Sequence, residues 1–372
     1  MTFPPKLSIL MSLMHRRDFL HFSLSSLAAS GFPWQQRPSQ YPRLRELAIA
    51  KGLFFGSAVS DPQLRRTDLT DLIVDQCSIV VPENAMKWRL TQPEQDRFDF
   101  TQADAFMHFA ESNHLLARGH NLCWHEHNPA WLESIVTPQN AAKILTSHIR
   151  TVVTRYQGRI HSWDVVNEGI RPEHHNHNDL TTSIWLTNIG EDYIDLAYRT
   201  AAEADPNVLL TYNDFDIETD EPAQEKKREA ILAMLHRMTK KGTPIHALGV
   251  QAHLRTYAGL PTFNGLNKFL KEIEKFNLQV YVTELDVDDS SLPADIPERD
   301  RLVAEYYKTF LANIVRQPNL KAVLTWCLSD RDSWLQGFRP RKDGLPQRPL
   351  PFDADLNPTP AFFALRDAFS SH

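Results

Sequence analysis

The chain has 372 residues, of which 42% are hydrophobic and 23% are charged, and it contains 8 Trp and 20 Phe. This composition is too apolar and aromatic for a disordered chain and too interrupted by charge for a bundle of membrane helices. The net charge is −6, and because residues 1–30 carry +2, residues 31–372 carry −8. Such an acidic body argues against binding to nucleic acid or to an anionic membrane.

The N-terminal segment, residues 1–30, resembles an export signal of the twin-arginine type. It contains His15-Arg16-Arg17-Asp18-Phe19-Leu20, followed by a mildly apolar run that ends in small residues. We therefore expect a protein exported to the periplasm or secreted, with a frayed basic tail as the alternative. Residues 31–43 are predicted to be a spacer.

From residue 44 onward, short runs rich in β-branched and aromatic residues alternate with longer amphipathic stretches. One such stretch, Pro222 to Lys241, has the start and stop signals of a helix, because Asp220 and Glu221 precede the proline and Gly242 follows the lysines. The predicted strands are Leu53–Val59, Ile79–Pro82, Leu115–Trp124, Ser162–Val166, Val208–Tyr212, Ala247–Val250, Val280–Thr283 and Ala322–Trp326. Eight strands alternating with helices predict an α/β fold, a single (β/α)8 TIM barrel over residues 44–372, with a doubly wound sheet as the alternative.

Cysteine and glycine patterns exclude several cofactors. Cys77, Cys123 and Cys327 cannot form a disulfide framework, and neither a CxxC pair nor a Cys/His finger spacing occurs. The sequence also has no P-loop and no GxGxxG. We expect no cofactor.

Polar side chains collect where the predicted strands end, which in a TIM barrel is where the active site lies. Glu168 and Glu284 stand out because each directly follows a predicted strand, the fourth and the seventh. Two carboxyl groups that face each other across a barrel mouth are what glycoside hydrolysis requires. Two ordinary salt-bridged carboxylates are the alternative.

The sequence from Phe55 to Leu365 resembles glycoside hydrolase family 10, the endo-β-1,4-xylanases. The resemblance is specific because nine segments match in the order in which the family has them. These segments are Glu83–Trp88, Arg118–His120 with Trp124-His125, Trp163–Glu168, Ala204–Asn207, Tyr212–Asp214, Gly249–Leu254, Thr283–Asp286, Asp330–Trp334 and Pro349–Asp353.

The resemblance implies a retaining endo-1,4-β-xylanase that works by a two-glutamate double displacement. Glu168 would be the acid/base, with Asn167 beside it bonding the 2-hydroxyl of the sugar at the cleavage point. Glu284 would be the nucleophile, held by His253, which Asp286 would orient. Glu168 must gain and lose a proton, so its neighbours, which we expect to include Trp124, Asp164 and Gln251, have to hold its pKa near the working pH.

The resemblance also implies the residues that bind xylan or xylo-oligosaccharides. Glu83, Asn84 and Lys87 would bind the sugar two places from the cut on the non-reducing side, and His120 would bind the sugar next to the cut. Trp326 and Trp334 would line the same cleft. An ion pair between neighbouring loops is the alternative for the first group, and Trp131, Trp163 and Trp185 are expected to be packing residues. We expect a monomer.

Four positions depart from the family pattern. His127 stands where Gln is usual, beside the charged Glu126, and Gly169-Ile170 follows the acid/base where Ala is commoner. Asp96 and Cys327 each replace a usual Gly. We expect the change at His127 to affect hydrogen bonding near the acid/base.

Three other functions remain alternatives. His125 and His127 have a metal-ligand spacing, as in a metal-dependent barrel hydrolase, although His174-His175-Asn176-His177 is predicted to be a solvated loop. A barrel that binds polysaccharide without cutting it would lack one of the two glutamates. A related barrel glycosidase acting on β-glucan would differ at Asn84, Lys87 and Trp326.

Overall fold

The computed structural model describes residues 41–371, except residue 258. The predicted export signal at residues 1–30, and the spacer up to residue 40, lie outside the described residues and stay predictions. Within the described part, no helix combines the length and the apolar character needed to cross a membrane.

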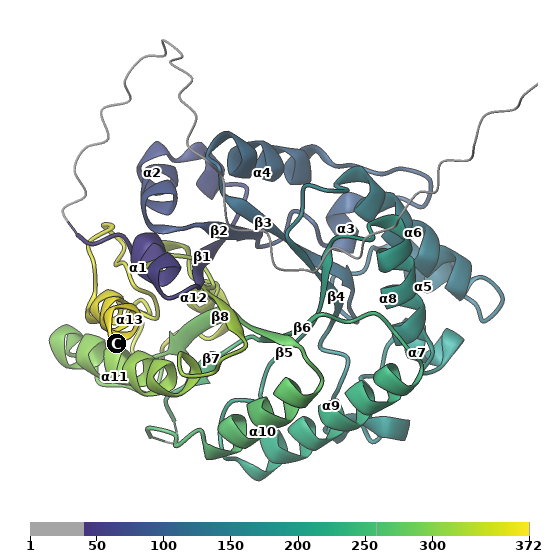
Figure 1. Cartoon of the computed structure of the whole chain (residues 1–372). Helices are drawn as coiled ribbons and strands as arrows, with labels where there is room; N and C mark the ends of the chain where they lie inside the picture. Colours follow the sequence, from purple (N-terminus) through teal and green to yellow (C-terminus); the bar gives the residue numbers. More distant parts are fainter. Residues whose placement is uncertain (1–40, 258, 372) are drawn as a thin grey trace, which may run out of the picture. The chain divides into compact units, whose positions relative to one another are not determined.

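A closed ring of parallel strands forms the centre of the fold (Figure 1). Each strand pairs with the next along the chain, and the pairings of β6 with β8 and of β9 with β1 close the ring. The strands of the ring are β1 (Phe54–Val59), β2 (Ile79–Pro82), β3 (Leu116–Cys123), β4 (Ser162–Asn167), β5 (Leu209–Asp214), β6 (Ala247–Val250), β8 (Gln279–Asp288) and β9 (Leu320–Thr325). The predicted (β/α)8 barrel is confirmed, and the doubly wound sheet is wrong.

One predicted strand is much longer than its sequence pattern indicated. The prediction ended the seventh strand at Thr283, but β8 continues to Asp288 because a short strand, β7 (His253–Arg255), pairs with its far end. Glu284 and Asp286 therefore lie inside a strand, and not in the loop after it. This position fixes their backbone more firmly than a loop would.

Helices surround the ring (Figure 1). They are α1 (Leu44–Ala50), α2 (Thr67–Gln76), α3 (Trp88–Thr91), α4 (Thr101–Ser112), α5 (Ala130–Ile135), α6 (Ala141–Arg155), α7 (Ile184–Ile189), α8 (Tyr193–Ala204), α9 (Pro222–Lys240), α10 (Asn264–Lys275), α11 (Ile296–Ile314), α12 (Leu335–Phe338) and α13 (Pro360–Ser370), with short 3-10 turns η1 (Gln63–Arg65), η2 (Pro172–His174), η3 (His177–Asp179) and η4 (Asp330–Asp332). The predicted helix from Pro222 is α9. It ends one residue before the predicted end, and Gly242 follows with a φ of 62°.

Apolar side chains pack on both sides of the ring. Most of the core lies in one large cluster that includes strand and helix residues, among them the fully buried Trp163 and Trp185. A second, smaller cluster is built mainly from strand residues, including Ala58, Val81 and Tyr281. Because strand residues alternate between two faces, we assign this second cluster to the barrel interior.

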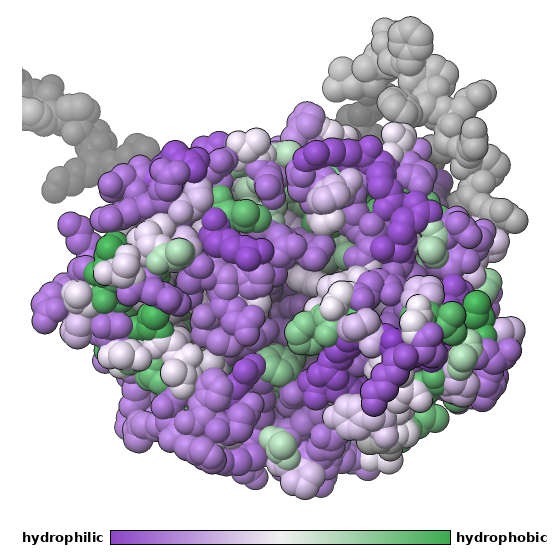
Figure 2. Space-filling view, turned by 180° about the vertical axis from the view of Figure 1, so that it is seen from behind, coloured by the Kyte–Doolittle hydropathy of each residue, from purple (hydrophilic) through white to green (hydrophobic). Residues whose placement is uncertain are grey.

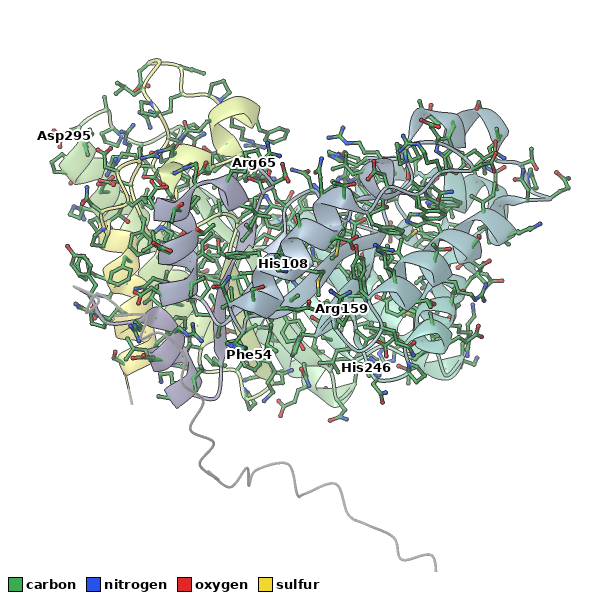
Figure 3. The ribbon with its side chains drawn as sticks, turned by 90° about the horizontal axis from the view of Figure 1, so that it is seen from above. Phe54, Arg65, His108, Arg159, His246 and Asp295 are labelled. Atoms are coloured by element: carbon green, nitrogen blue, oxygen red, sulfur yellow. The ribbon has the colours of Figure 1, made fainter. Side chains whose placement is uncertain are left out.

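The strands of the barrel all begin at one end and finish at the other (Figure 3). Phe54 and His246, at the starts of β1 and β6, lie at one end, whereas Arg65 and Asp295, which come after β1 and β8, lie at the other. The carboxyl ends of the strands therefore share one face. Figure 2 shows a face that is hollowed near its centre and bordered mostly by hydrophilic residues.

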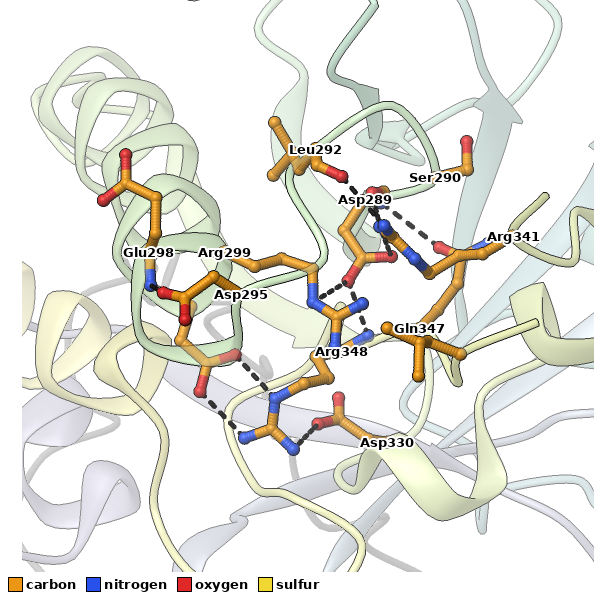
Figure 4. Close-up of polar contacts among 12 residues, drawn as sticks. Asp289, Ser290, Leu292, Asp295, Glu298, Arg299, Asp330, Arg341, Gln347 and Arg348 are labelled. Atoms are coloured by element: carbon orange, nitrogen blue, oxygen red, sulfur yellow. Dashed lines mark hydrogen bonds and ion pairs between the residues drawn. The ribbon is translucent and has the colours of Figure 1, made fainter. Parts of the chain in front are cut away.

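A buried ionic cluster holds the long loops on this face together (Figure 4). Asp289, directly after β8, lies 3.4 Å from Arg299 of α11 and 3.6 Å from Arg341. Its Oδ2 also accepts a hydrogen bond of 2.9 Å from the backbone of Arg348, whose guanidinium donates to both carboxylate oxygens of Asp300 at 2.6 and 2.8 Å. The cluster thus ties the segment around residues 341–348 to β8 and α11.

Candidate active site

A cleft of 520 Å³ opens at the carboxyl ends of the strands, and every predicted site residue lines it. This volume lies within the range of about 300–1,000 Å³ that is usual for ligand sites. The residues are Glu83, Asn84, Lys87, His120, Trp124, Asn167, Glu168, Gln251, His253, Glu284, Asp286, Trp326 and Trp334. The barrel therefore brings together side chains that lie up to 251 residues apart in the sequence, from Glu83 to Trp334.

Glu168 lies directly after β4 with its backbone in the left-handed region, at a φ of 54°. Its backbone N–H donates to the carbonyl of Asn213, at 2.9 Å. The carboxylate accepts hydrogen bonds from Trp124 Nε1 at 2.9 Å and from Gln251 Nε2 at 3.1 Å. A non-glycine residue in this region of φ is strained, and such strain clusters at functional sites.

Burial raises the pKa of Glu168, and the negative charges of Asp214 and Glu284 raise it further. The hydrogen bonds from Gln251 and Trp124 favour the ionised carboxylate and partly offset this rise. The expectation that Asp164 acts on Glu168 is wrong, because Asp164 pairs with Arg118 and with His120 Nδ1, the latter at 3.0 Å. Asp214 is instead the carboxylate whose negative charge raises the pKa of Glu168.

Glu284 is buried inside β8 and is hydrogen-bonded through both of its oxygens. Asn213 Nδ2 donates to Oε1 at 2.7 Å, and His253 Nε2 lies 3.2 Å from Oε2. Burial raises the pKa of Glu284, but the hydrogen bond from His253, the positive charges of His120 and His253 and the bond from Asn213 outweigh it, so the pKa lies below its usual value. The two glutamates thus have pKa values displaced in opposite directions.

His253 connects Glu284 to Asp286. Its Nδ1 lies 2.9 Å from Asp286 Oδ1, and Trp334 Nε1 donates to the other oxygen of Asp286 at 2.7 Å. Burial lowers the pKa of His253, but the charge and hydrogen bond of Asp286 and those of Glu284 raise it well above the usual value. The imidazole can therefore stay protonated and donate to both carboxylates.

Asn213 links the two glutamates, and its position demands a glycine nearby. Its Nδ2 donates to Asn167 Oδ1 at 2.9 Å as well as to Glu284, while its Oδ1 accepts from Thr283 Oγ1 at 2.7 Å. A Cβ atom on Gly249 would lie only 2.2 Å from that Oδ1. Gly249 therefore leaves the space that the Asn213 amide needs.

Lys87, Asn84 and Glu83 lie together at the β2 side of the cleft. Lys87 Nζ donates to Asn84 Oδ1 at 3.1 Å and lies 5.1 Å from the centre of the Trp124 ring. Burial lowers the pKa of Lys87 and raises that of Glu83. Among the described residues no ion pair within 4.0 Å joins Glu83 to Lys87, so these polar groups keep bonding capacity for a ligand.

Comparisons with known proteins identify the family. The family model for glycosyl hydrolase family 10 matches residues 43–368. The chain belongs to this family. Endo-1,4-beta-xylanase B of Thermotoga neapolitana is 33% identical over 291 residues, which cover 78% of this chain and 80% of that protein.

Solved structures agree with this membership of family 10. Native xylanase 10B from Thermotoga maritima has a TM-score of 0.79 and 32% identity, covering 88% of this chain and 98% of that one. Xylanase 10B from Thermotoga petrophila RKU-1, solved in complex with xylobiose, has the same TM-score and identity over 89% and 98%. The chain is a glycoside hydrolase with a (β/α)8 barrel.

Two of the departures from family 10 lie beside the site. His127 stacks on Trp124, with ring centres 5.0 Å apart and planes 9° apart, and its buried Nδ1 has no hydrogen-bond partner among the described residues. Burial, followed by the charges of Lys87, Arg89 and His120, lowers the pKa of His127 to about 4. Cys327 has a φ of 75°, a conformation in which glycine would be unstrained.

The metal-dependent alternative finds no support in the described part of this family 10 chain. Among those residues, no group of three His, Cys, Asp or Glu side chains is placed to hold a metal ion. Both ring nitrogens of His125 are buried without a hydrogen bond, and His177 pairs with Glu191 at 2.8 Å on the surface.

Several cleft residues were not predicted from the sequence. They include Arg171, Phe215, Arg255, Phe338 and Arg339. Asn213, which bonds Glu284, was noted in a matching segment but was given no role. Arg171 and Phe215 each come shortly after a strand, so their position in the sequence could have pointed to them. Phe338 and Arg339 lie in the long segment after β9, where no strand end marks them.

Proposed function

We propose that this chain is an endo-1,4-β-xylanase that hydrolyses internal bonds of xylan with retention of anomeric configuration. The observation that carries the proposal is the pair Glu168 and Glu284, two carboxyl groups in one cleft with pKa values displaced upward and downward. Two titratable groups separated in this way suit an acid and a nucleophile. Family membership and the names of the relatives supply the substrate.

In the first step, Glu284 attacks the anomeric carbon while Glu168 gives its proton to the glycosidic oxygen. The bond between that carbon and the leaving oxygen breaks, and a covalent ester between the sugar and Glu284 forms. The lowered pKa of Glu284 keeps it ionised for the attack, and the raised pKa of Glu168 keeps it protonated for the transfer. Asn213 and His253 hold the attacking carboxylate.

In the second step, water attacks the same carbon. Glu168, now ionised, takes a proton from that water, and Glu284 leaves as the free carboxylate. Both displacements invert the anomeric carbon, so the product keeps the configuration of the substrate. Gln251 and Trp124 would stabilise Glu168 in its ionised form through their hydrogen bonds.

The test is the anomeric form of the first products, followed by proton NMR during hydrolysis of linear xylan, with carboxymethyl cellulose as the competing substrate. The expected result is β product before mutarotation and almost no cutting of cellulose. Initial α product would overturn the double displacement. Cellulose cut as fast as xylan would overturn the substrate assignment.

A further inference from the structure

Three arginines line the cleft. A line from β4 to β8 divides its rim: Arg171 and Arg255 lie on the side of β5 to β7, whereas Arg339, in the segment after β9, pairs with Asp288 of β8 itself. Glu83, Lys87 and His127 lie on the other side. The two sides therefore offer different chemistry to a polymer that lies across both.

Two of these arginines donate hydrogen bonds to carboxylates. Arg255 lies 3.0 Å from Asp216, and Arg339 lies 3.4 Å from Asp288 and covers the ring of Phe338 at 5.7 Å. At least one donor of each of these guanidinium groups is therefore already used within the chain.

Arg171 differs, because its guanidinium donates no hydrogen bond to any described residue, and its Nε is buried without a partner. It forms ion pairs with Glu173 at 3.6 Å and with Glu168 at 4.0 Å, and both are longer than a hydrogen bond. The side chain is 21% exposed, and its guanidinium lies 5.1 Å from the centre of the Phe215 ring. A guanidinium carries five donors in a fixed plane, so this one is held in place with its donors unused.

We propose that Arg171 binds a carboxylate on the substrate, so that the enzyme prefers xylan chains with uronic acid branches. The planar guanidinium matches a carboxylate through two parallel hydrogen bonds, which hydroxyl groups of a neutral sugar cannot reproduce. Arg255 and Arg339 add positive charge to the same cleft, and each already donates a hydrogen bond to a carboxylate. This assignment rests on the proposed xylanase function.

The test compares two polymers that differ only at the uronic acid carboxyl group: glucuronoxylan, and the same polymer after chemical reduction of its carboxyl groups to alcohols. The readout is the ratio of kcat/KM on the acidic polymer to kcat/KM on the reduced one. A hydrogen-bonded charge pair of this kind corresponds to a ratio of about 10 or more for the wild type. The ratio should fall as salt is added, because salt screens partly exposed charges.

Arg171→Met keeps an apolar stem over Phe215 and removes the charge, and it should bring the ratio to about 1. Arg339→Met is the matched control, since it removes a cleft guanidinium that is already paired, and it should keep most of the ratio. Because each ratio is taken within one variant, a general loss of rate cancels. If Arg339→Met lowered this ratio of kcat/KM values as much as Arg171→Met does, the assignment to Arg171 would be overturned.

The wild-type measurement alone can still overturn the proposal if Arg171→Met does not fold. A wild-type ratio of 1 with rapid cutting of linear xylan would overturn the carboxylate preference and leave the xylanase function standing. No cutting of linear xylan or of either glucuronoxylan would overturn the xylanase function itself. The two failures are therefore distinguishable.

Discussion

Two clusters of buried charged side chains lie at the carboxyl ends of the strands, and they compensate carboxylates differently. In the ionic cluster around Asp289 (Figure 4), arginines face the carboxylates directly, and Arg348 donates hydrogen bonds of 2.6 and 2.8 Å to Asp300. In the cleft, no arginine or lysine of the described chain reaches Glu168 or Glu284 at hydrogen-bonding distance. Their partners are Trp124, Gln251, Asn167, Asn213 and His253.

The difference distinguishes carboxylates that hold loops together from carboxylates that could take part in a reaction. A permanent guanidinium beside a buried carboxylate favours its anionic form and offsets part of the cost of burying it, which suits a joint between loops, although burial still raises the pKa of Asp289. Amides and an indole N–H stabilise the anion less, so a buried carboxyl that they surround can still exchange its proton. Glu168 has this second environment, and the raised pKa follows from its burial.

The largest effect is expected at the nucleophile. Glu284→Ala removes the group that bonds to the sugar, so kcat on xylan should fall by about four orders of magnitude or more. Added azide should restore part of the rate on an aryl xyloside and give a glycosyl azide of inverted configuration, since azide would occupy the space of the lost carboxylate. Activity above about a tenth of wild type would contradict the role of Glu284.

Glu168→Ala should separate substrates by their leaving groups. On xylan, whose leaving oxygen needs a proton, the loss should be about 100- to 10,000-fold, the usual contribution of a general acid. On an aryl xyloside with an acidic phenol, formation of the glycosyl-enzyme should be much less affected, as a pre-steady-state burst would reveal. Equal losses on both substrates would show that Glu168 is not the acid.

A substitution inside the ionic cluster should lower the stability of the protein. Asp289→Asn removes a buried charge that lies between Arg299 and Arg341, so the free energy of unfolding should drop by about 3–5 kcal/mol in chemical denaturation. Asp343→Asn is the matched control, because Asp343 also pairs with Arg341, at 2.6 Å, but lies at the surface. It should change stability little. Equal losses in both variants would mean that burial does not set the effect.

The order of the strands and the residue types around the two glutamates were predictable from the sequence, although β8 runs five residues past its predicted end at Thr283. Glu168, His253 and Glu284 were placed correctly in one cleft because parallel strands bring their carboxyl ends to one face. The ionic cluster was not predictable, because Asp289, Arg299 and Arg348 belong to segments whose packing depends on the folded loops. Charge patterns in a sequence do not show which side chains become buried.

The hydrogen-bond partners of the cleft residues were harder to predict than which residues line the cleft. Asp164 was expected among the neighbours of Glu168, yet Arg118 and His120 bind it. Side chains that alternate along a strand point to opposite faces, but the partner of each depends on the register of the next strand. The unbonded guanidinium of Arg171 likewise follows from distances that the sequence does not contain.

A smaller change should move the pH profile and leave the reaction type intact. Gln251→Leu removes a hydrogen bond that favours the ionised form of Glu168, so the pKa of Glu168 should rise. Because the first step needs Glu168 protonated, the basic limb of kcat/KM against pH should move to higher pH. The acidic limb, which reports ionisation of Glu284, is the internal control and should stay where it is. A basic limb displaced to lower pH would contradict the role of Gln251.

The smallest effect is expected at His127, which contacts Glu168 only through Trp124. His127→Gln introduces the residue usual in the family and removes a stacked ring, which corresponds to about 0.5–1.5 kcal/mol, or a loss in kcat/KM of about 2- to 12-fold. His127→Phe keeps a ring on Trp124 and should stay close to wild type above pH 5, where His127 is already neutral because burial lowers its pKa to about 4. A loss in the Phe variant equal to that in the Gln variant would show that a ring nitrogen of His127, and not the stacking, serves the site.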